Sequence, residues 1–308
     1  MALVAFSSRT PRPVRIPRTA PKPHRPAEEF TIGKSRLRFY LGDCLEVLPS
    51  LEPASIGVVV TSPPYNIGVK YRSYQDDIPR SDYLNWTDGW LRAASKVMTP
   101  DASLFLNVGA KPTDPWIPLE VAQVARRFFK LQNTIHWVKS IAIDREAAGG
   151  AGLDRDMAVG HYKPINSERF VNDCHEFIFH FTPTGNTRLD RRAVGVPYQD
   201  PSNIKRWAAA GEGLRCRGNT WFIPYETIQN RDRDRPHPAS FPTKVPEQCL
   251  RLHGLERAGT VLDPFLGLGT SAIASARLGL DFVGVEMDPQ YLQDAVKRVK
   301  AALEVDPA

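Results

Sequence analysis

Short apolar runs alternate with segments of helical spacing in this chain, and this alternation constrains the fold more than any other feature. Runs typical of strands lie at 36–41, 56–61, 103–109, 131–139, 260–265 and 281–287. Segments with apolar residues three and four positions apart lie at 44–51, 82–98, 117–129, 243–255, 270–279 and 289–303. Strands that alternate with helices form parallel sheets, because each crossover returns the chain to the same edge. The sequence therefore predicts an α/β fold.

The alternation stops between residues 141 and 236. One clear strand is predicted there, at 174–182, and the chain after it is polar and basic. A loop this long without secondary structure is rare inside a compact domain. We therefore predict that residues 141–236 are an insertion with a function of their own, between sheet-forming halves at 31–140 and 237–308.

The net charge of +6 belongs to the amino-terminal end of the chain. Residues 1–26 carry no acid and six cations, Arg9, Arg12, Arg15, Arg18, Lys22 and Arg25, so residues 27–308 sum to zero. Six prolines in the same stretch disfavour a regular helix. We predict a disordered basic tail over residues 1–30. A solvated extension is favoured over an electrostatic arm that touches phosphates. The lack of acids is compatible with a transit peptide, but the prolines argue against the amphipathic helix of such a peptide.

Several protein classes are disfavoured by composition. No stretch approaches the roughly 20 apolar residues of a membrane span, and residues 1–6 are too short for a signal-peptide core. The four cysteines form no CxxC pair, which argues against a zinc ribbon or a disulfide framework. The seven histidines show no spacing typical of a metal site. We expect a cytoplasmic protein without a membrane segment or a metal.

The loop LDPFLGLGT, residues 262–270, directly follows a predicted strand and opens a helix. Gly267 and Gly269 allow a sharp turn and a close approach of the backbone to a ligand. Glu286 ends the next strand, at a spacing that suits a carboxylate holding two ribose hydroxyls. The loop matches neither GxGxxG nor GxxxxGK[ST], which argues against NAD and against ATP as the ligand. The pattern favours a nucleoside-containing cofactor, and a tight structural turn is the alternative.

The loop TSPPYN, residues 61–66, also follows a strand. Two successive prolines fix the backbone and leave a rigid loop that presents carbonyl acceptors. Ser62 adds a hydroxyl and Tyr65 an aromatic ring, so the loop could hold an amino group and stack on a planar base. Taken alone, a stiff loop that merely ends a strand is an equal interpretation.

Together the two loops resemble the motifs of the amino-methyltransferases of DNA, a family that includes bacterial modification methylases. TSPPYN matches the catalytic [D/N/S]PP[Y/F] motif, and DPFLGLGT matches the cofactor motif DPFxGxGT. The catalytic loop comes first, as in the permuted β group. Residues 41–48, with Asp43, and 237–250, with Phe241, resemble further cofactor segments. The resemblance covers residues 36–140 and 220–305.

The resemblance implies a Rossmann-like methyltransferase sheet, S-adenosylmethionine as cofactor and DNA as substrate. The catalytic half would be 31–140, the target-recognition insertion 141–236 and the cofactor-binding half 237–308. By motif match, the catalytic residues are Ser62, Pro63, Pro64 and Tyr65, and the cofactor residues are Asp43, Phe241, Asp263, Pro264, Phe265, Gly267, Gly269, Thr270 and Glu286. A cognate restriction endonuclease is a further expected partner, and a monomer and a homodimer are both compatible with the sequence.

Residues 186–235 hold ten cations against six acids. Arginine reads guanine edges and binds phosphates. We predict that DNA contacts Arg188, Arg191, Arg192, Lys205, Arg206, Arg215 and Arg217. The alternative is a solvated surface loop with internal ion pairs, which suits the sequence RDRDR at 231–235.

The base remains open at this stage. Methylation of a cytosine ring carbon needs a thiolate, which the enzymes for that reaction carry in a Pro-Cys pair, and no cysteine here follows a proline. In the resembled family Ser at the first catalytic position usually accompanies cytosine N4, and Asp accompanies adenine N6. Ser62 therefore favours cytosine N4, with adenine N6, an amino group in RNA and a non-catalytic DNA-binding subunit as alternatives.

Overall fold

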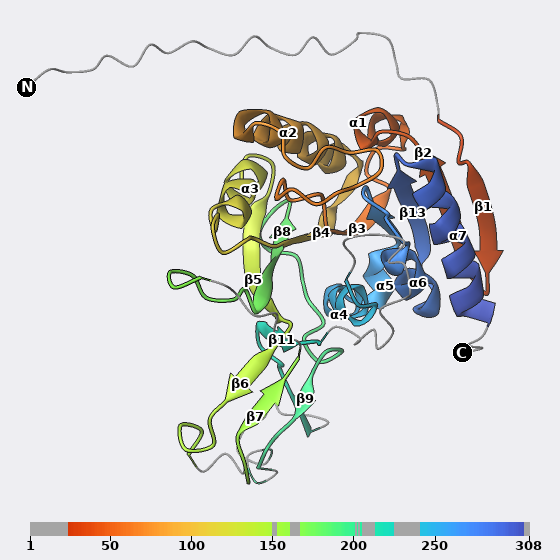
Figure 1. The fold of residues 1–308 in the computed structure, drawn as a ribbon. Helices are drawn as coiled ribbons and strands as arrows, with labels where there is room; N and C mark the ends of the chain where they lie inside the picture. Colours follow the sequence, from red (N-terminus) through yellow and green to blue (C-terminus); the bar gives the residue numbers. More distant parts are fainter. Residues whose placement is uncertain are drawn as a thin grey trace, which may run out of the picture.

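The computed structural model describes residues 24–149, 153–160, 167–200, 202, 204, 213–224 and 241–304. Its centre is one sheet, in which the strands lie in the order β1-β2-β13-β12-β3-β4-β8-β5-β11 (Figure 1). In that order they are β1 (Glu28–Ile32), β2 (Ser35–Leu41), β13 (Asp281–Glu286), β12 (Thr260–Asp263), β3 (Ile56–Thr61), β4 (Met98–Val108), β8 (His175–Thr182), β5 (Lys130–Val138) and β11 (Thr220–Phe222). Strands β2 to β4 run parallel, whereas β8 is antiparallel to both of its neighbours.

Helices cover both faces of this sheet (Figure 1). They are α1 (Cys44–Val47), the 3-10 turn η1 (Leu48–Ser50), α2 (Arg80–Val97), α3 (Ile117–Ala125), α4 (Lys244–His253), α5 (Leu255–Ala258), α6 (Thr270–Arg277) and α7 (Pro289–Glu304). Strand β3 is buried throughout. Its Val58 and Val60 belong to the core under α4, α6 and α7, and Val59 belongs to the core under α1, α2 and α3. The predicted α/β fold is therefore confirmed.

Two boundaries differ from the sequence prediction. Residues 28–30 were expected in the tail, but they belong to β1, which pairs antiparallel with β2. The ring of Phe30 stacks on the ring of Phe39 in β2 at a separation of 5.4 Å, and this contact stabilises the pair. The predicted tail otherwise lies mostly outside the described residues. The second difference concerns the insertion at 141–236, which is not one unit outside the sheet. Strand β8 lies between β4 and β5, and β11 extends the edge at β5.

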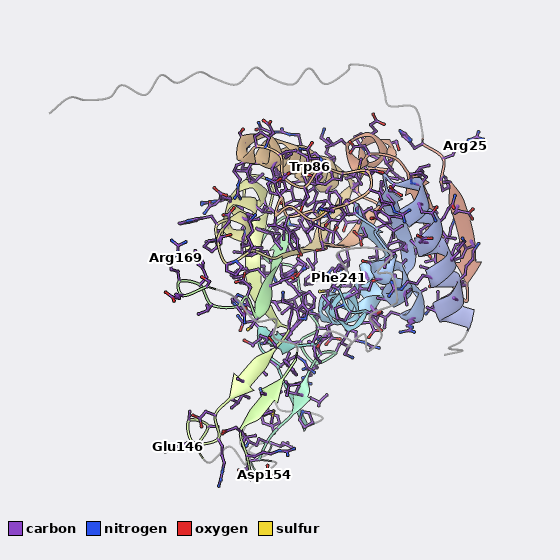
Figure 2. The ribbon with its side chains drawn as sticks, viewed as in Figure 1. Arg25, Trp86, Glu146, Asp154, Arg169 and Phe241 are labelled. Carbon is purple, nitrogen blue, oxygen red and sulfur yellow. The ribbon has the colours of Figure 1, made fainter. Side chains whose placement is uncertain are left out.

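The remaining short strands form an arm that projects from the sheet near β5 and β11 (Figure 1). It contains the pair β6 (Ile141–Ile143) and β7 (Met157–Val159), and the pair β9 (Val196–Pro197) and β10 (Leu214–Arg215). Glu146 and Asp154 lie at its far end (Figure 2). The sequence did not predict these strands, because each is only two or three residues long.

A polar chain links four elements of the core, β5, β8, β4 and α4. Asn133 donates to His180 Nδ1 at 3.0 Å, and Ser103 Oγ lies 2.9 Å from both His180 Nε2 and His253 Nδ1. Because His180 Nδ1 accepts from an amide, its proton is on Nε2 and points to Ser103. Burial lowers the pKa of His180 to about 3 and that of His253 to about 4, so both rings are neutral at pH 7.

Candidate active site

The functional residues predicted from sequence gather at the carboxyl ends of the parallel strands. Glu286 at the end of β13 pairs with Leu41 at the end of β2, and Asp263 at the end of β12 lies between β13 and β3. Strand β3 ends at Thr61, directly before the SPPY loop. Open parallel sheets bind ligands at this edge, and the two loops are neighbours here although they are 200 residues apart in the chain.

Glu286 is held by backbone amides. Its carboxylate accepts from Gly267 N–H at 2.9 Å and from Asp288 N–H at 3.0 Å. Only 9% of the residue is exposed, and burial raises its pKa to about 7. Gly267 and Gly269 both have positive φ, at 53° and 73°. Glycine is favoured there because other side chains are strained in this conformation.

Asp263 faces the protein interior. Its carboxylate accepts from Thr61 Oγ1 at 2.7 Å, from Ser271 Oγ at 2.6 Å and from Phe265 N–H at 3.1 Å. Burial raises the pKa of this carboxyl group. One side chain thus joins the last residue of β3, the cofactor loop and the start of α6. Asp263 therefore fixes the two loops relative to each other.

The other predicted cofactor residues surround this edge. Asp43 caps α1 by accepting from Leu45 N–H at 2.9 Å, and the neighbouring Gly42 N–H donates to the Glu286 carbonyl at 2.9 Å. Phe265 packs against Trp86 and Trp90 of α2, at ring separations of 5.4 and 5.2 Å. Pro264 is buried, Thr270 Oγ1 accepts from Arg298, and Phe241 is half-buried beside α4 (Figure 2).

Three exposed apolar side chains at this edge were missed by the sequence analysis. Leu41 and Met287 are 44% exposed and Leu45 is 36% exposed, and all three are within two residues of Asp43 or Glu286. A buried carboxylate, a helix N-terminus at α6 and exposed apolar side chains fit a nucleoside with a charged amino-acid tail. The set therefore fits S-adenosylmethionine.

The SPPY loop is part of a polar cluster. Ser62 Oγ and Tyr65 Oη are 2.6 Å apart, and Tyr65 Oη donates to Glu176 Oε2 at 3.0 Å. Asn107 Nδ2 lies 2.7 Å from both Tyr65 Oη and Glu176 Oε2. Lys139 forms an ion pair with Glu176 Oε1 at 3.1 Å. Pro64 also contributes, because its carbonyl accepts from Tyr83 Oη at 3.0 Å, while Pro63 is buried.

Asn107, Lys139 and Glu176 were not predicted as site residues. Asn107 and Lys139 come at the ends of β4 and β5, and Glu176 is the second residue of β8. Because β8 is antiparallel, its first residues reach the edge at which the parallel strands end. A charged residue in the apolar run HEFIFHFT was the available signal.

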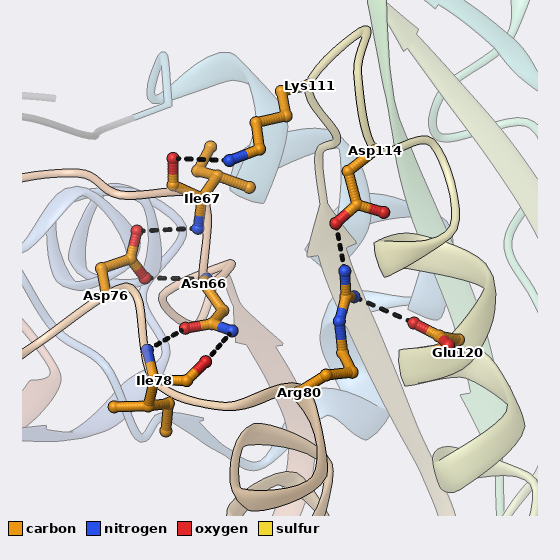
Figure 3. A network of polar contacts seen from close by, with 8 residues as sticks. All are labelled: Asn66, Ile67, Asp76, Ile78, Arg80, Lys111, Asp114 and Glu120. Atoms are coloured by element: carbon orange, nitrogen blue, oxygen red, sulfur yellow. Dashed lines mark hydrogen bonds and ion pairs between the residues drawn. The ribbon is translucent and has the colours of Figure 1, made fainter.

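The segment after the SPPY loop, residues 66–79, lies between the two halves of the site. The buried Asp76 carboxylate accepts from the backbone N–H groups of Asn66 and Ile67 (Figure 3). It also accepts from Val69 N–H. On one side Arg80 pairs with Asp114 and Glu120 (Figure 3). On the other, Ser73 donates to Asp288, and Arg72 lies over the Tyr291 ring at 5.4 Å. The segment is thus anchored on both sides of the catalytic loop.

The predicted DNA-contacting arginines are only partly described. Arg188, Arg191 and Arg192 are exposed in the segment after β8. Arg215 is exposed in β10, and half-buried Arg217 donates to the Val194 carbonyl at 3.0 Å. Lys205 and Arg206 lie outside the described residues. Arg215 pairs in register with Val196, so the two arginine groups meet at the β9–β10 pair.

Neither a metal-binding cluster nor a membrane-spanning helix is found in the described part of the chain. In those residues, no group of three His, Cys, Asp or Glu side chains could hold a metal ion. Over the same ranges, no helix is both long and apolar enough to cross a membrane. The expectation that the protein binds no metal stays a prediction.

Residues 56–297 match the model of the N6 and N4 methyltransferase family, described as DNA methylase. The chain belongs to this family. It is 28% identical over 292 residues to the type II methyltransferase M.BglII of Bacillus subtilis, covering 92% of this chain and 71% of that one. The type II methyltransferase M.ScaI of Streptomyces caespitosus is 26% identical over 276 residues, covering 87% and 82%.

Solved structures agree with this assignment. A protein from Thermus thermophilus described as a DNA modification methylase matches with a TM-score of 0.57 at 26% identity, covering 86% of this chain and 95% of that one. Its complex with S-adenosyl-L-methionine gives 0.55 at 25% identity, with 86% and 94% covered. The cytosine-N4-specific PvuII methyltransferase shares the fold, with a TM-score of 0.57 at 19% identity over 88% and 92%.

The family assignment establishes the chemistry at the coarse level. The chain is a DNA methyltransferase that modifies exocyclic amino groups of bases, with S-adenosylmethionine as cofactor and DNA as substrate. The resemblance inferred from the SPPY and DPFLGLGT loops is therefore confirmed, as is the Rossmann-like methyltransferase fold.

Proposed function

We propose that this DNA methyltransferase modifies the N4 amino group of cytosine. The observation that carries the proposal is Ser62 at the first position of the SPPY loop, where its hydroxyl lies 2.6 Å from Tyr65 Oη. A neutral hydroxyl and a backbone carbonyl accept the amine hydrogens without adding charge to the pocket. In the resembled family this position commonly holds Ser for cytosine and Asp for adenine. Adenine N6 is the alternative product.

The proposed division of labour follows the two loops. Ser62 and the Pro63 carbonyl hold the amino group, and Tyr65 stacks on a base that has been flipped out of the duplex. Glu286 takes the ribose of the cofactor, Asp43 lies beside its adenine, and Phe241 and the residues of the DPFLGLGT loop complete that pocket. The bound cofactor supplies an electrophilic methyl group. The amine must lose conjugation with its ring to attack, and out-of-plane acceptors favour that change.

Target recognition is assigned to the projecting arm and the arginines beside it. The β9–β10 pair joins the segment of Arg188, Arg191 and Arg192 to Arg215. Arginines on such a projection suit phosphate and guanine contacts. A cognate restriction endonuclease, a monomeric or homodimeric state and a cytoplasmic location stay predictions from the resemblance.

The product decides between the two bases. DNA from cells that express the protein is digested to nucleosides and analysed by mass spectrometry. We expect N4-methylcytosine, and a strong loss of it for Tyr65→Ala, because stacking on a flipped base contributes about 1–3 kcal/mol. N6-methyladenine alone would overturn the cytosine assignment and spare the amine chemistry, whereas 5-methylcytosine would overturn both.

A further inference from the structure

We infer that Glu176 is a positioning residue for methyl transfer. Glu176 makes Ser62 a hydrogen-bond acceptor, and it receives the proton that the amine releases. The inference rests on the proposed role of Ser62 as the group that meets the target amine. It does not depend on whether that amine belongs to cytosine or adenine.

The direction of each hydrogen bond in the cluster follows from the carboxylate. An ionised carboxylate only accepts, so Tyr65 Oη donates its single proton to Glu176 Oε2 over 3.0 Å. With that proton committed, the 2.6 Å bond between Tyr65 and Ser62 must have Ser62 as the donor. Ser62 Oγ is left with its lone pairs, one of which faces Asn107 Nδ2 at 3.4 Å, so Ser62 can accept from a further partner but not donate to it. Glu176 therefore turns a hydroxyl of ambiguous polarity into an acceptor for an N–H group.

The surroundings of Glu176 stabilise this polarity. Lys139 Nζ lies 3.1 Å from Glu176 Oε1 and favours the charged form. Asn107 Nδ2 donates to Tyr65 Oη and to Glu176 Oε2, both at 2.7 Å. Its Oδ1 is buried and has no hydrogen-bond partner among the described residues. Buried unpaired acceptors call for an explanation, and a donor that arrives with the substrate provides one.

The pocket leaves little room for another arrangement. A Cβ added at Gly109 would lie 2.9 Å from the Tyr65 ring and 3.1 Å from Glu176 Cδ. Two further titratable groups interact electrostatically with Glu176, namely His175 beside it in β8 and Tyr71 of segment 66–79. The direct contacts to its carboxylate come from Tyr65, Asn107 and Lys139, and these three set the hydrogen-bond pattern around it.

The same chain of atoms gives the released proton a path. As the amine nitrogen forms a bond to the methyl carbon, the bond from that carbon to the cofactor's sulfonium sulfur breaks, and its electron pair stays on sulfur, which becomes neutral. The amine nitrogen becomes positively charged, and one N–H bond must break with its electron pair returning to nitrogen. That proton passes to Ser62 Oγ, the Ser62 proton passes to Tyr65 Oη, and the Tyr65 proton passes to Glu176. The carboxylate becomes a neutral acid, both hydroxyls are restored, and charge is conserved.

The test compares Glu176→Gln with the parent protein, using kcat for methyl transfer from radiolabelled S-adenosylmethionine to DNA. We expect kcat to fall about 100-fold, the low end of the range for positioned proton transfer. Calorimetric affinity for S-adenosylmethionine and the melting temperature should change little. KM for DNA should change little, so that the loss falls on kcat. Glu176→Asp should recover part of the rate.

Glu52→Gln is the matched control. Glu52 is exposed and precedes β3 at the opposite edge of the sheet, so its replacement should leave both kcat and KM unchanged. The inference is overturned if Glu176→Gln keeps kcat within about twofold of the parent, or loses rate only through a raised KM for DNA. A product of N6-methyladenine would contradict only the cytosine proposal, because every measurement here counts methyl transfer to either base.

Discussion

At the scale of single residues, the most informative feature is a carboxylate that is buried although burial disfavours its charged form. Glu286 is 9% exposed, with two backbone N–H groups as partners and a pKa raised to about 7. The folded chain tolerates this cost at the position that we propose binds the ribose hydroxyls of the cofactor. Perturbed carboxylates of this kind are typical of functional sites. Asp263 shows the opposite use, because its hydroxyl partners are internal and its role is to join the two loops.

The Glu286 assignment leads to a binding prediction. Glu286→Ala should weaken S-adenosylmethionine binding by roughly 2–5 kcal/mol, since two hydrogen bonds to a charged group are lost. Titration calorimetry measures this directly. In the parent protein, affinity should be highest above pH 7 and should decline below it, because the raised pKa protonates the acceptor there. The same affinity in the variant as in the parent at pH 8 would remove Glu286 from the ribose site.

At the scale of elements, the position of β8 has the largest consequences. This strand carries Glu176 to the active edge and His180 into the core, where His180, Ser103 and His253 connect β8, β4 and α4. The polar chain works only with neutral rings. Segment 66–79 acts at the same scale, because Asp76 orders it, its Ser73 donates to Asp288 after β13, and Arg80 directly after it pairs with Asp114 after β4.

The histidine chain predicts acid sensitivity. The folded pKa values of His180 and His253, about 3 and about 4, lie below the ordinary value of 6.5, so the unfolded chain takes up protons first. The contribution of the two neutral rings to the free energy of unfolding is fully present above pH 6.5. It is lost as the pH falls toward 4, at up to about 1.4 kcal/mol per pH unit for each ring. Urea unfolding at several pH values measures this slope.

A pair of variants separates this effect from general acid denaturation. His253→Gln should flatten the slope between pH 6.5 and 4, since one buried titrating ring is removed. His24→Gln is the control, because His24 is exposed and should leave the slope as in the parent. Equal slopes in all three proteins would mean that the two buried rings do not govern acid stability.

At the scale of the whole molecule, charge is divided unevenly. The basic end of the chain carries the entire net charge, and we propose that the folded body meets DNA through local arginines. Of those arginines, Arg215 lies in β10 of the projecting arm, and Arg188, Arg191 and Arg192 precede β9 in the chain. A long-range, salt-sensitive contribution and a local, sequence-reading one are thus assigned to different parts of the molecule.

This division is testable by truncation. Removing residues 1–23 takes away five cations and should lower DNA affinity modestly at low salt, with little effect near physiological salt. The melting temperature should stay the same, because β1 begins only at Glu28. Binding isotherms at several salt concentrations measure the change in slope. A large drop in melting temperature would show that these residues pack against the fold.

The sequence by itself determined the sheet-forming segments, the two ligand loops and the family. Apolar periodicity and strand-end glycines are local properties, and motifs such as SPPY and DPFLGLGT remain readable without coordinates. Only the tertiary structure decided that Asp263 meets Thr61, or that Glu176 reaches Tyr65. These partners are separated by more than 100 residues, and strand order sets their contact. Sequence spacing carries no information about which strands become neighbours, because sheet pairing depends on the packing of the whole chain.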